Sequence, residues 1–333
     1  MKKAAAVIVA IVLAALAAFV VYDATLNKTV SESFFAMNTL VSAEVTGISA
    51  KEDCTEIEKI VSRLDTETLS RTAEGSEIFR LNKNGGGEIG EKTAEYFSLL
   101  TDVCEKSGGA FDFTLGGVSD LWKFGSNPEI PDENALADAL SHSGYKKVFL
   151  DGNTVSVSDS LVIDFGAAGK GIALDEIKNH LEASKAKRAV VAVGGSVLLY
   201  GEGDFTVGIR NPEGNSGSYL AKLKTDACCV STSGSYEQSF EKNGRIYHHI
   251  LDPKTGYPAD NEVLSVTIVS DSGLLSDALS TACFVLGVEK GFELAEGYGA
   301  RAVFVTKDKK IIARNNIEDI IEITNEDYTL VIQ

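Results

Sequence analysis

The stretch that decides the fold is IDFGAAGKGIALD, residues 163–175. It follows the pattern of a strand that ends in a turn of small residues and continues into a helix. Within the turn, Gly and Ala let a ligand approach the backbone closely, and the first N–H groups of the helix attract an anion. Lys170 adds a positive charge at the same place. A tight strand-to-helix turn with close packing explains the same residues, so this motif alone does not establish a binding site.

Outward from this stretch, apolar periodicity predicts a single domain from Asn27 to Gln333 without a low-complexity linker. Helical spacing predicts helices around residues 57–64 and 94–104, the second ending at Gly108-Gly109. Val-, Ile- and Phe-rich segments predict strands at 161–165, 189–193, 205–209, 263–269 and 300–305, with a closing pair of strands within 317–332. Residues 72–90 and 124–133 are expected to be loops. Because several strands follow one another, an α+β fold with a mixed sheet fits better than a doubly wound one.

The N-terminus carries a targeting or membrane segment. Lys2 and Lys3 precede an apolar run over residues 4–22, long enough to cross a bilayer as a helix. The two lysines orient the rest of the chain to the outside. We therefore expect residues 1–26 to be an uncleaved anchor, or a signal peptide cleaved near Ala15-Leu16-Ala17, and the domain over 27–333 to lie outside the cytoplasm at the cell membrane.

Composition and missing motifs narrow the possible functions. With 31 Lys+Arg against 48 Asp+Glu, the formal charge is -17, which disfavours nucleic-acid binding. A phosphate-bearing substrate would need local attraction. No GxGxxG motif follows a predicted strand, no GxSxG or HExxH motif is present, and the cysteines lack zinc-site spacing. All five are expected to be buried thiols in apolar surroundings: Cys54, Cys104, Cys228, Cys229 and Cys283.

Two further patterns carry groups suited to chemistry. Asp277 and Thr281 lie four residues apart, on one helical face, and offer the hard oxygens that Mg²⁺ prefers. An acid near a helix N-terminus is also stabilised by the helix dipole alone. His248 and His249 would point to opposite faces of an extended segment, so at most one of them serves a given site.

Together and in this order, these segments resemble the ApbE family, the FAD:protein FMN transferases of bacterial envelopes. The resemblance runs from about residue 35 to residue 305. It rests on the segments Ala36–Thr39, Gly109–Asp112, Ile163–Asp175, Val193–Gly195, Ser231–Tyr236, His249–Gly256 and Asp277–Gly287.

The resemblance implies mixed sheets flanked by helices, with FAD in a cleft and magnesium on its pyrophosphate. By position in the family motifs, the FAD contacts are Met37, Thr72, Ala110, Phe111, Asp112, Asp164, Lys170 and Leu251. The implied metal ligands are Ala167 through its carbonyl, Asp277 and Thr281, and His249 is the implied base. The chain departs from the family at two places: Thr72 replaces an aromatic residue, and Ser280 replaces a second acid that some members carry.

The activity implied by the resemblance is the Mg²⁺-dependent transfer of FMN from FAD to a Ser or Thr of an acceptor protein, with release of AMP. The acceptor would be a flavoprotein of a membrane or extracytoplasmic redox system. Two alternatives stay open: a Mg²⁺-dependent FAD pyrophosphatase, in which water replaces the acceptor hydroxyl, and a non-catalytic flavin-binding protein of the envelope. The acceptor's identity, the oligomeric state and the choice among hard divalent cations are not readable from the chain.

Overall fold

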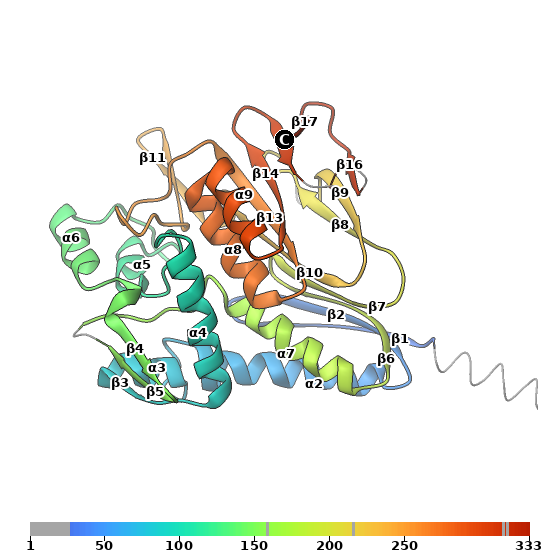
Figure 1. The fold of residues 1–333 in the computed structure, drawn as a ribbon, viewed down its shortest axis with the longest axis horizontal. Coiled ribbons are helices and arrows are strands. Elements are labelled where there is room, and N and C mark those ends of the chain that lie inside the picture. Colours follow the sequence, from blue (N-terminus) through green and yellow to red (C-terminus); the bar gives the residue numbers. More distant parts are fainter. Residues whose placement is uncertain (1–26, 158–159, 215–216, 315–316, 318–319) are drawn as a thin grey trace, which may run out of the picture.

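The computed structural model describes residues 27–157, 160–214, 217–314, 317 and 320–333. The predicted anchor or signal over residues 1–26 lies outside this part. Among the described residues, none of the helices has the length and apolar character needed to cross a membrane. The predicted α+β class is confirmed: helices and sheets are both extensive, and the strands pair largely antiparallel (Figure 1).

A nine-stranded sheet forms the centre of the molecule, in the order β1-β2-β6-β7-β10-β13-β14-β15-β17. All neighbours pair antiparallel except β15 and β17. Its strands are β1 Thr29–Ala36, β2 Thr39–Gly47, β6 Ala186–Val193, β7 Ser196–Gly201, β10 Cys228–Gly234, β13 Val263–Ser270, β14 Arg301–Thr306, β15 Lys310–Ala313 and β17 Thr329–Ile332.

Smaller sheets and the helices surround this centre. The smaller sheets contain β3 Gly86–Glu88, β4 Val148–Asp151 and β5 Thr154–Val157; β8 Phe205–Arg210, β9 Tyr219–Thr225 and β16 Ile321–Ile323; and the hairpin β11 Ser239–Lys242 with β12 Arg245–His248. The helices are α2 Ala50–Arg63, α3 Glu77–Asn84, α4 Glu91–Lys106, α5 Gly116–Trp122, α6 Glu133–Ser141, α7 Gly169–Ala183, α8 Gly273–Leu286 and α9 Val288–Gly297, with a π-helical turn η1 Leu64–Leu69 and a 3-10 turn η2 Tyr145–Lys147.

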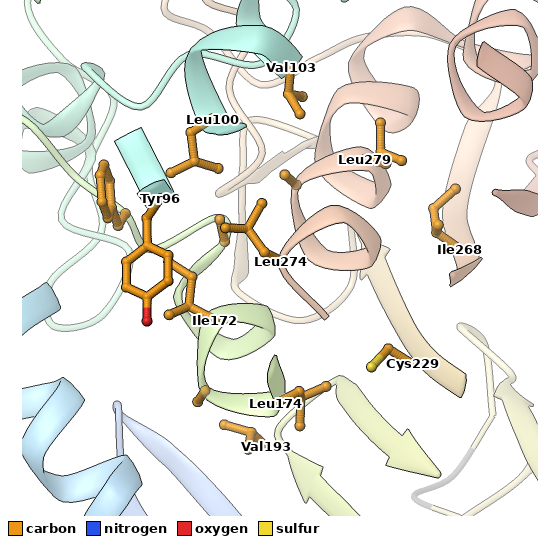
Figure 2. Close-up of a cluster of buried hydrophobic side chains, with 14 of the residues drawn as sticks. Tyr96, Leu100, Val103, Ile172, Leu174, Val193, Cys229, Ile268, Leu274 and Leu279 are labelled. Atoms are coloured by element: carbon orange, nitrogen blue, oxygen red, sulfur yellow. The ribbon is translucent and has the colours of Figure 1, made fainter. Parts of the chain in front are cut away.

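The middle of the central sheet is covered on both faces, which explains the apolar runs of β6 and β7, whereas β1 and β2 keep an exposed face. The paired residues Val191 and Leu198 face the core shared with α7 and α8, and their neighbours Val190 and Leu199 face the β8–β9 sheet. Figure 2 shows the first core, where Ile172 and Leu174 of α7 lie near Leu274 of α8.

The cysteines follow the same alternation along β10. Cys229 belongs to the core beneath α7 and α8, and Cys228 to the core on the opposite face. Because their side chains point to opposite faces, the two neighbours do not bridge. All five cysteines are buried free thiols, as predicted.

Three local predictions are wrong. Residues 72–90 contain α3 and β3. Residues 161–165 are buried but form no strand, because the Asn82 amide takes the place of a strand partner: it donates to the Ile163 carbonyl (2.9 Å) and accepts from the Ile163 N–H (2.8 Å). Strands β16 and β17 exist within 317–332, but they join different sheets and do not pair with each other.

Candidate active site

The site is built where α7 and α8 cross. Gly171 and Gly273 meet so closely that a Cβ on Gly171 would lie 2.0 Å from the Gly273 carbonyl oxygen. Asp175, one turn further along α7, caps the N-terminus of α8: its carboxylate accepts from the N–H groups of Gly273 (2.6 Å) and Leu274 (2.9 Å). The close contact of Gly171 and the capping by Asp175, both within residues 163–175, therefore fix α8 against α7.

This crossing places the Asp277 carboxylate beneath the first turn of α7. Asp277 is only 3% exposed. Its Oδ2 accepts from the Gly171 N–H (3.0 Å), its Oδ1 accepts from the Ser196 hydroxyl (3.0 Å), and Lys170 Nζ lies 3.5 Å from the same Oδ1. A buried carboxylate is tolerated only with such partners. Asp277 is thus held rigidly, with a cationic side chain beside it.

Hydroxyl groups continue the site along α8. Thr281 lies one turn after Asp277, and the Ser233 hydroxyl from β10 lies 3.2 Å from its Oγ1. Ser233 also hydrogen-bonds Ser280 (2.7 Å), whose hydroxyl donates to the Asp277 carbonyl (2.8 Å). The Ser280 hydroxyl therefore has its hydrogen-bond partners within the protein.

The donor set fits a magnesium ion that arrives with a phosphate. Asp277 offers one rigid carboxylate, Thr281 a hydroxyl, and the partly buried Ala167 lies in the turn that opens α7. Across the described residues, no three His, Cys, Asp or Glu side chains gather closely enough to hold a metal by themselves. Mg²⁺ often binds in this way, through one or two carboxylates completed by substrate phosphates and water.

The two adjacent histidines have different surroundings. His248 ends β12, packs edge-on against Phe284, and places Nε2 3.1 Å from the Ala259 carbonyl oxygen. His249 follows the strand; its Nδ1, like that of His248, is buried without a hydrogen-bond partner among the described residues. Burial, the Lys170 charge and His248 together lower the pKa of His249 to about 4. His249 thus stays neutral at pH 7 and keeps one ring nitrogen uncommitted.

Two predicted flavin contacts lie at the same helix terminus. Met37 occupies the tight turn between β1 and β2 with a φ of 50°, held there by its N–H, which donates to Asp65 (2.8 Å). Its methyl group packs over Gly169, 3.4 Å from the position of an added Cβ. Asp164 precedes the turn, and its Oδ1 accepts from the Gly166 N–H (2.8 Å).

Comparison with known proteins identifies the family. The ApbE family model matches residues 37–304. This chain belongs to the ApbE family. It is 34% identical to the FAD:protein FMN transferase of Treponema pallidum over 79% of each chain, and 28% identical to that of Escherichia coli K12 over 82% of each. Among solved structures it is similar to an ApbE protein of Thermotoga maritima (TM-score 0.80, 30% identity, 88% of this chain and 99% of that one) and to the apo flavinyl transferase ApbE of Pseudomonas stutzeri (0.74, 28%, 84% and 91%).

Other residues that the ApbE motifs predict as flavin contacts already pack or hydrogen-bond inside the protein. Ala110 and Phe111 are buried, and Phe111 belongs to the main core. Asp112 accepts from the N–H and hydroxyl of Thr114 (2.9 and 2.6 Å) and from the N–H of Tyr145 (3.0 Å). Burial raises the pKa of Asp112 despite these bonds. Any contact of this segment with FAD would therefore use its backbone more than its side chains.

Leu251 and Thr72 lie in different environments. Leu251 is buried in the aromatic cluster around Trp122, whereas Thr72 is exposed in the loop before α3. The Thr72 hydroxyl lies 3.2 Å from that of Ser70. For both, the role in FAD binding stays a prediction.

Two residues beside the site, Ser196 and Glu237, were missed from the sequence. The Ser196 hydroxyl donates to Asp277. Because Ser196 directly follows the Val193–Gly195 segment, the sequence could have indicated that it lies at the site. Glu237 approaches Gly195, where its Oε1 would lie 3.3 Å from an added Cβ. Loss of solvation, reinforced by Asp277 and opposed by Lys170 and Arg210, raises the pKa of Glu237.

A separate surface cavity of about 940 Å³ lies at the other end of β10, away from Ser233. Cys228, Ser270, Tyr298 and Arg301 are among its lining residues, and it contains none of the predicted site residues. Cavity size therefore does not mark the site in this protein, whereas the arrangement of charged and hydroxyl groups does.

Proposed function

We propose that this protein is an FAD:protein FMN transferase, which attaches the FMN part of FAD to a Ser or Thr of an acceptor protein and releases AMP. One observation carries the proposal: three separate motifs supply neighbouring groups, since Lys170 of α7 lies beside Asp277 of α8, one turn before Thr281, and the Lys170 charge reaches His249. The similarity to the FAD:protein FMN transferases of Treponema pallidum and Escherichia coli supports the same activity.

The N-terminus of α7 suits the pyrophosphate of FAD. Helix N–H groups and Lys170 provide a local positive field on a chain whose formal charge is -17. Asp277, Thr281 and the Ala167 carbonyl would hold the ion. A bound Mg²⁺ would neutralise charge on the phosphate oxygens and on the departing AMP.

His249 would accept the proton of the acceptor hydroxyl. In the reaction, the hydroxyl oxygen forms a bond to the FMN-side phosphorus, the bond from that phosphorus to the bridging oxygen breaks, and AMP leaves with the bridging oxygen. The hydroxyl proton passes to the neutral imidazole. Because the pKa of His249 is lowered to about 4, the imidazole is unprotonated and ready at pH 7. A bound pyrophosphate would raise this pKa by its negative charge and strengthen the base.

We further propose that the domain works outside the cytoplasm, anchored or exported by residues 1–26, with FAD in a cleft beside α7. The acceptor would be a flavoprotein of a membrane or extracytoplasmic redox system. The basis is the apolar run after Lys2-Lys3 and the family's acceptors.

Incubation of the full chain with FAD, Mg²⁺ and a candidate acceptor tests the reaction. We expect one FMN on a Ser or Thr of the acceptor by mass spectrometry, an equal amount of AMP, and loss of both with EDTA. His249→Ala should lower turnover by about 10²-fold, while His142→Ala, at a partly exposed side chain, serves as its control. Free FMN without protein-linked flavin would show a pyrophosphatase instead, and equal transfer with EDTA would refute the need for a metal.

A further inference from the structure

Arg71 joins three segments at the edge of the proposed FAD site. It lies in the loop between η1 and α3, directly before Thr72. Its Nε lies 2.9 Å from Asp164 Oδ2, and its two terminal nitrogens donate to the two oxygens of Asp120 on α5 (2.9 and 2.6 Å). This is the bidentate geometry in which arginine and carboxylate interact most strongly.

The loop that carries Arg71 is itself fixed. The Ser70 hydroxyl accepts from the N–H groups of Thr72 (3.2 Å) and Ala73 (3.0 Å), and the buried Ser76 hydroxyl donates to the Ser70 carbonyl. With the backbone held on both sides, the guanidinium has little freedom. Its side chain is 23% exposed, so water competes only partly for its hydrogen bonds.

The contact extends from Arg71 into the turn that opens α7. Asp164 uses Oδ2 for Arg71 and Oδ1 for the Gly166 N–H (2.8 Å), and Gly166 directly precedes Ala167. Without Arg71, the Asp164 carboxylate would keep only its hydrogen bond from the Gly166 N–H and could rotate. The guanidinium also compensates negative charge from Asp164 and Asp120, which would otherwise repel an incoming pyrophosphate.

We propose that Arg71, backed by Asp120, is a positioning residue for FAD: it orients Asp164 and, through Gly166, the turn that binds the pyrophosphate. The inference rests on the proposed function. It assigns to Arg71 an effect on FAD affinity, with little effect on the transfer step itself. A lysine cannot replace it, because one ammonium group cannot bridge two carboxylates in this planar geometry.

The test measures FAD affinity by flavin fluorescence, and KM for FAD and kcat from AMP release, in the full chain. Arg71→Ala should raise the Kd and KM for FAD by about tenfold or more, as for other lost supporting contacts. The kcat should stay within about threefold of wild type. Arg71→Lys should not rescue affinity, and Asp120→Asn should show a smaller effect in the same direction. Glu129→Gln, which removes the exposed ion pair with Lys123 directly after α5, is the matched control.

A double variant separates positioning from general stabilisation. If Arg71 acts through Asp164, Arg71→Ala combined with Asp164→Ala should bind FAD no more weakly than Asp164→Ala alone. Additive losses, full rescue by Arg71→Lys, or a Kd for Arg71→Ala within twofold of wild type would overturn the inference. A wild-type chain that binds no FAD would instead refute the proposed function, so the two failures are distinguishable.

Discussion

Replacing Gly171 by alanine tests whether the close crossing of α7 and α8 builds the site. The added Cβ would lie 2.0 Å from the oxygen and 2.5 Å from the carbon of the Gly273 carbonyl, and 2.7 Å from Asp277 Cβ. These neighbours are backbone, or a side-chain carbon attached directly to it, so no rotamer change can relieve the overlap. Ordinary contacts need about 3.5 Å, so the two helices must separate by about 1.5 Å.

Both stability and activity should suffer. Forced expansion of a packed core costs about 1–3 kcal/mol, and weakening the hydrogen bond from the Gly171 N–H to the Asp277 carboxylate adds about 1.5 kcal/mol. With about 2 °C lost per kcal/mol in a domain of this size, the melting temperature should fall by roughly 5–9 °C. A displacement of Asp277 by about 1 Å should lower FMN transfer by about 10²-fold.

The assay combines thermal unfolding with FMN transfer at a temperature where both proteins are folded. Gly297→Ala in α9 is the control, because a Cβ there meets nothing within 4 Å. It should leave the melting temperature and the activity unchanged or slightly raised. A Gly171→Ala variant that melts within 2 °C of wild type and transfers FMN at the wild-type rate would refute the role given to this crossing.

Three further predictions concern charge, stacking and pH. Asp277→Asn keeps the shape of the side chain but removes the only carboxylate among the proposed metal ligands; transfer should fall by about 10²-fold and need more Mg²⁺, and an unchanged Mg²⁺ titration would contradict this role. Thr72→Tyr restores the aromatic residue of many family members, and fluorescence titration should show FAD binding about threefold to tenfold tighter, since an aromatic contact contributes about 1 kcal/mol; unchanged affinity would place residue 72 away from FAD. Burial lowers the pKa of His248 to about 4, so between pH 6.5 and 4 the unfolded state binds more protons than the folded state. The free energy of unfolding therefore decreases as the pH is lowered through this range, by up to about 3 kcal/mol. Urea unfolding of His248→Gln should show a weaker loss over this range, and an identical loss would contradict that origin.

Much of the fold was predictable from local periodicity. The apolar spacing of Ile57 and Val61 in α2 and of Phe97 and Leu100 in α4 led directly to those helices. The missed α3 carried an ordinary signal: Ser76 accepts from the Phe79 N–H as an N-cap, and Gly85 ends the helix with a φ of 72°. In contrast, the irregular backbone at Ile163 depends on Asn82, 81 residues earlier, and no local pattern reveals such a partner.

The candidate site was only partly predictable for a related reason. Motifs pointed to Asp277, Thr281, Lys170 and His249 because each lies in a recognisable stretch. Their meeting point was not predictable, since it depends on how α7 and α8 cross at Gly171. Supporting groups such as Arg71 act through ion pairs with distant residues, which a single sequence does not display.

A crystal structure with FAD and Mg²⁺ bound is the most direct test of where and how the nucleotide is held. We predict the pyrophosphate at the first turn of α7, the ion on Asp277 and Thr281, and His249 facing the FMN-side phosphorus. A nucleotide seated instead in the cavity beside Tyr298 and Arg301, with Asp277 still paired to Lys170, would contradict the account.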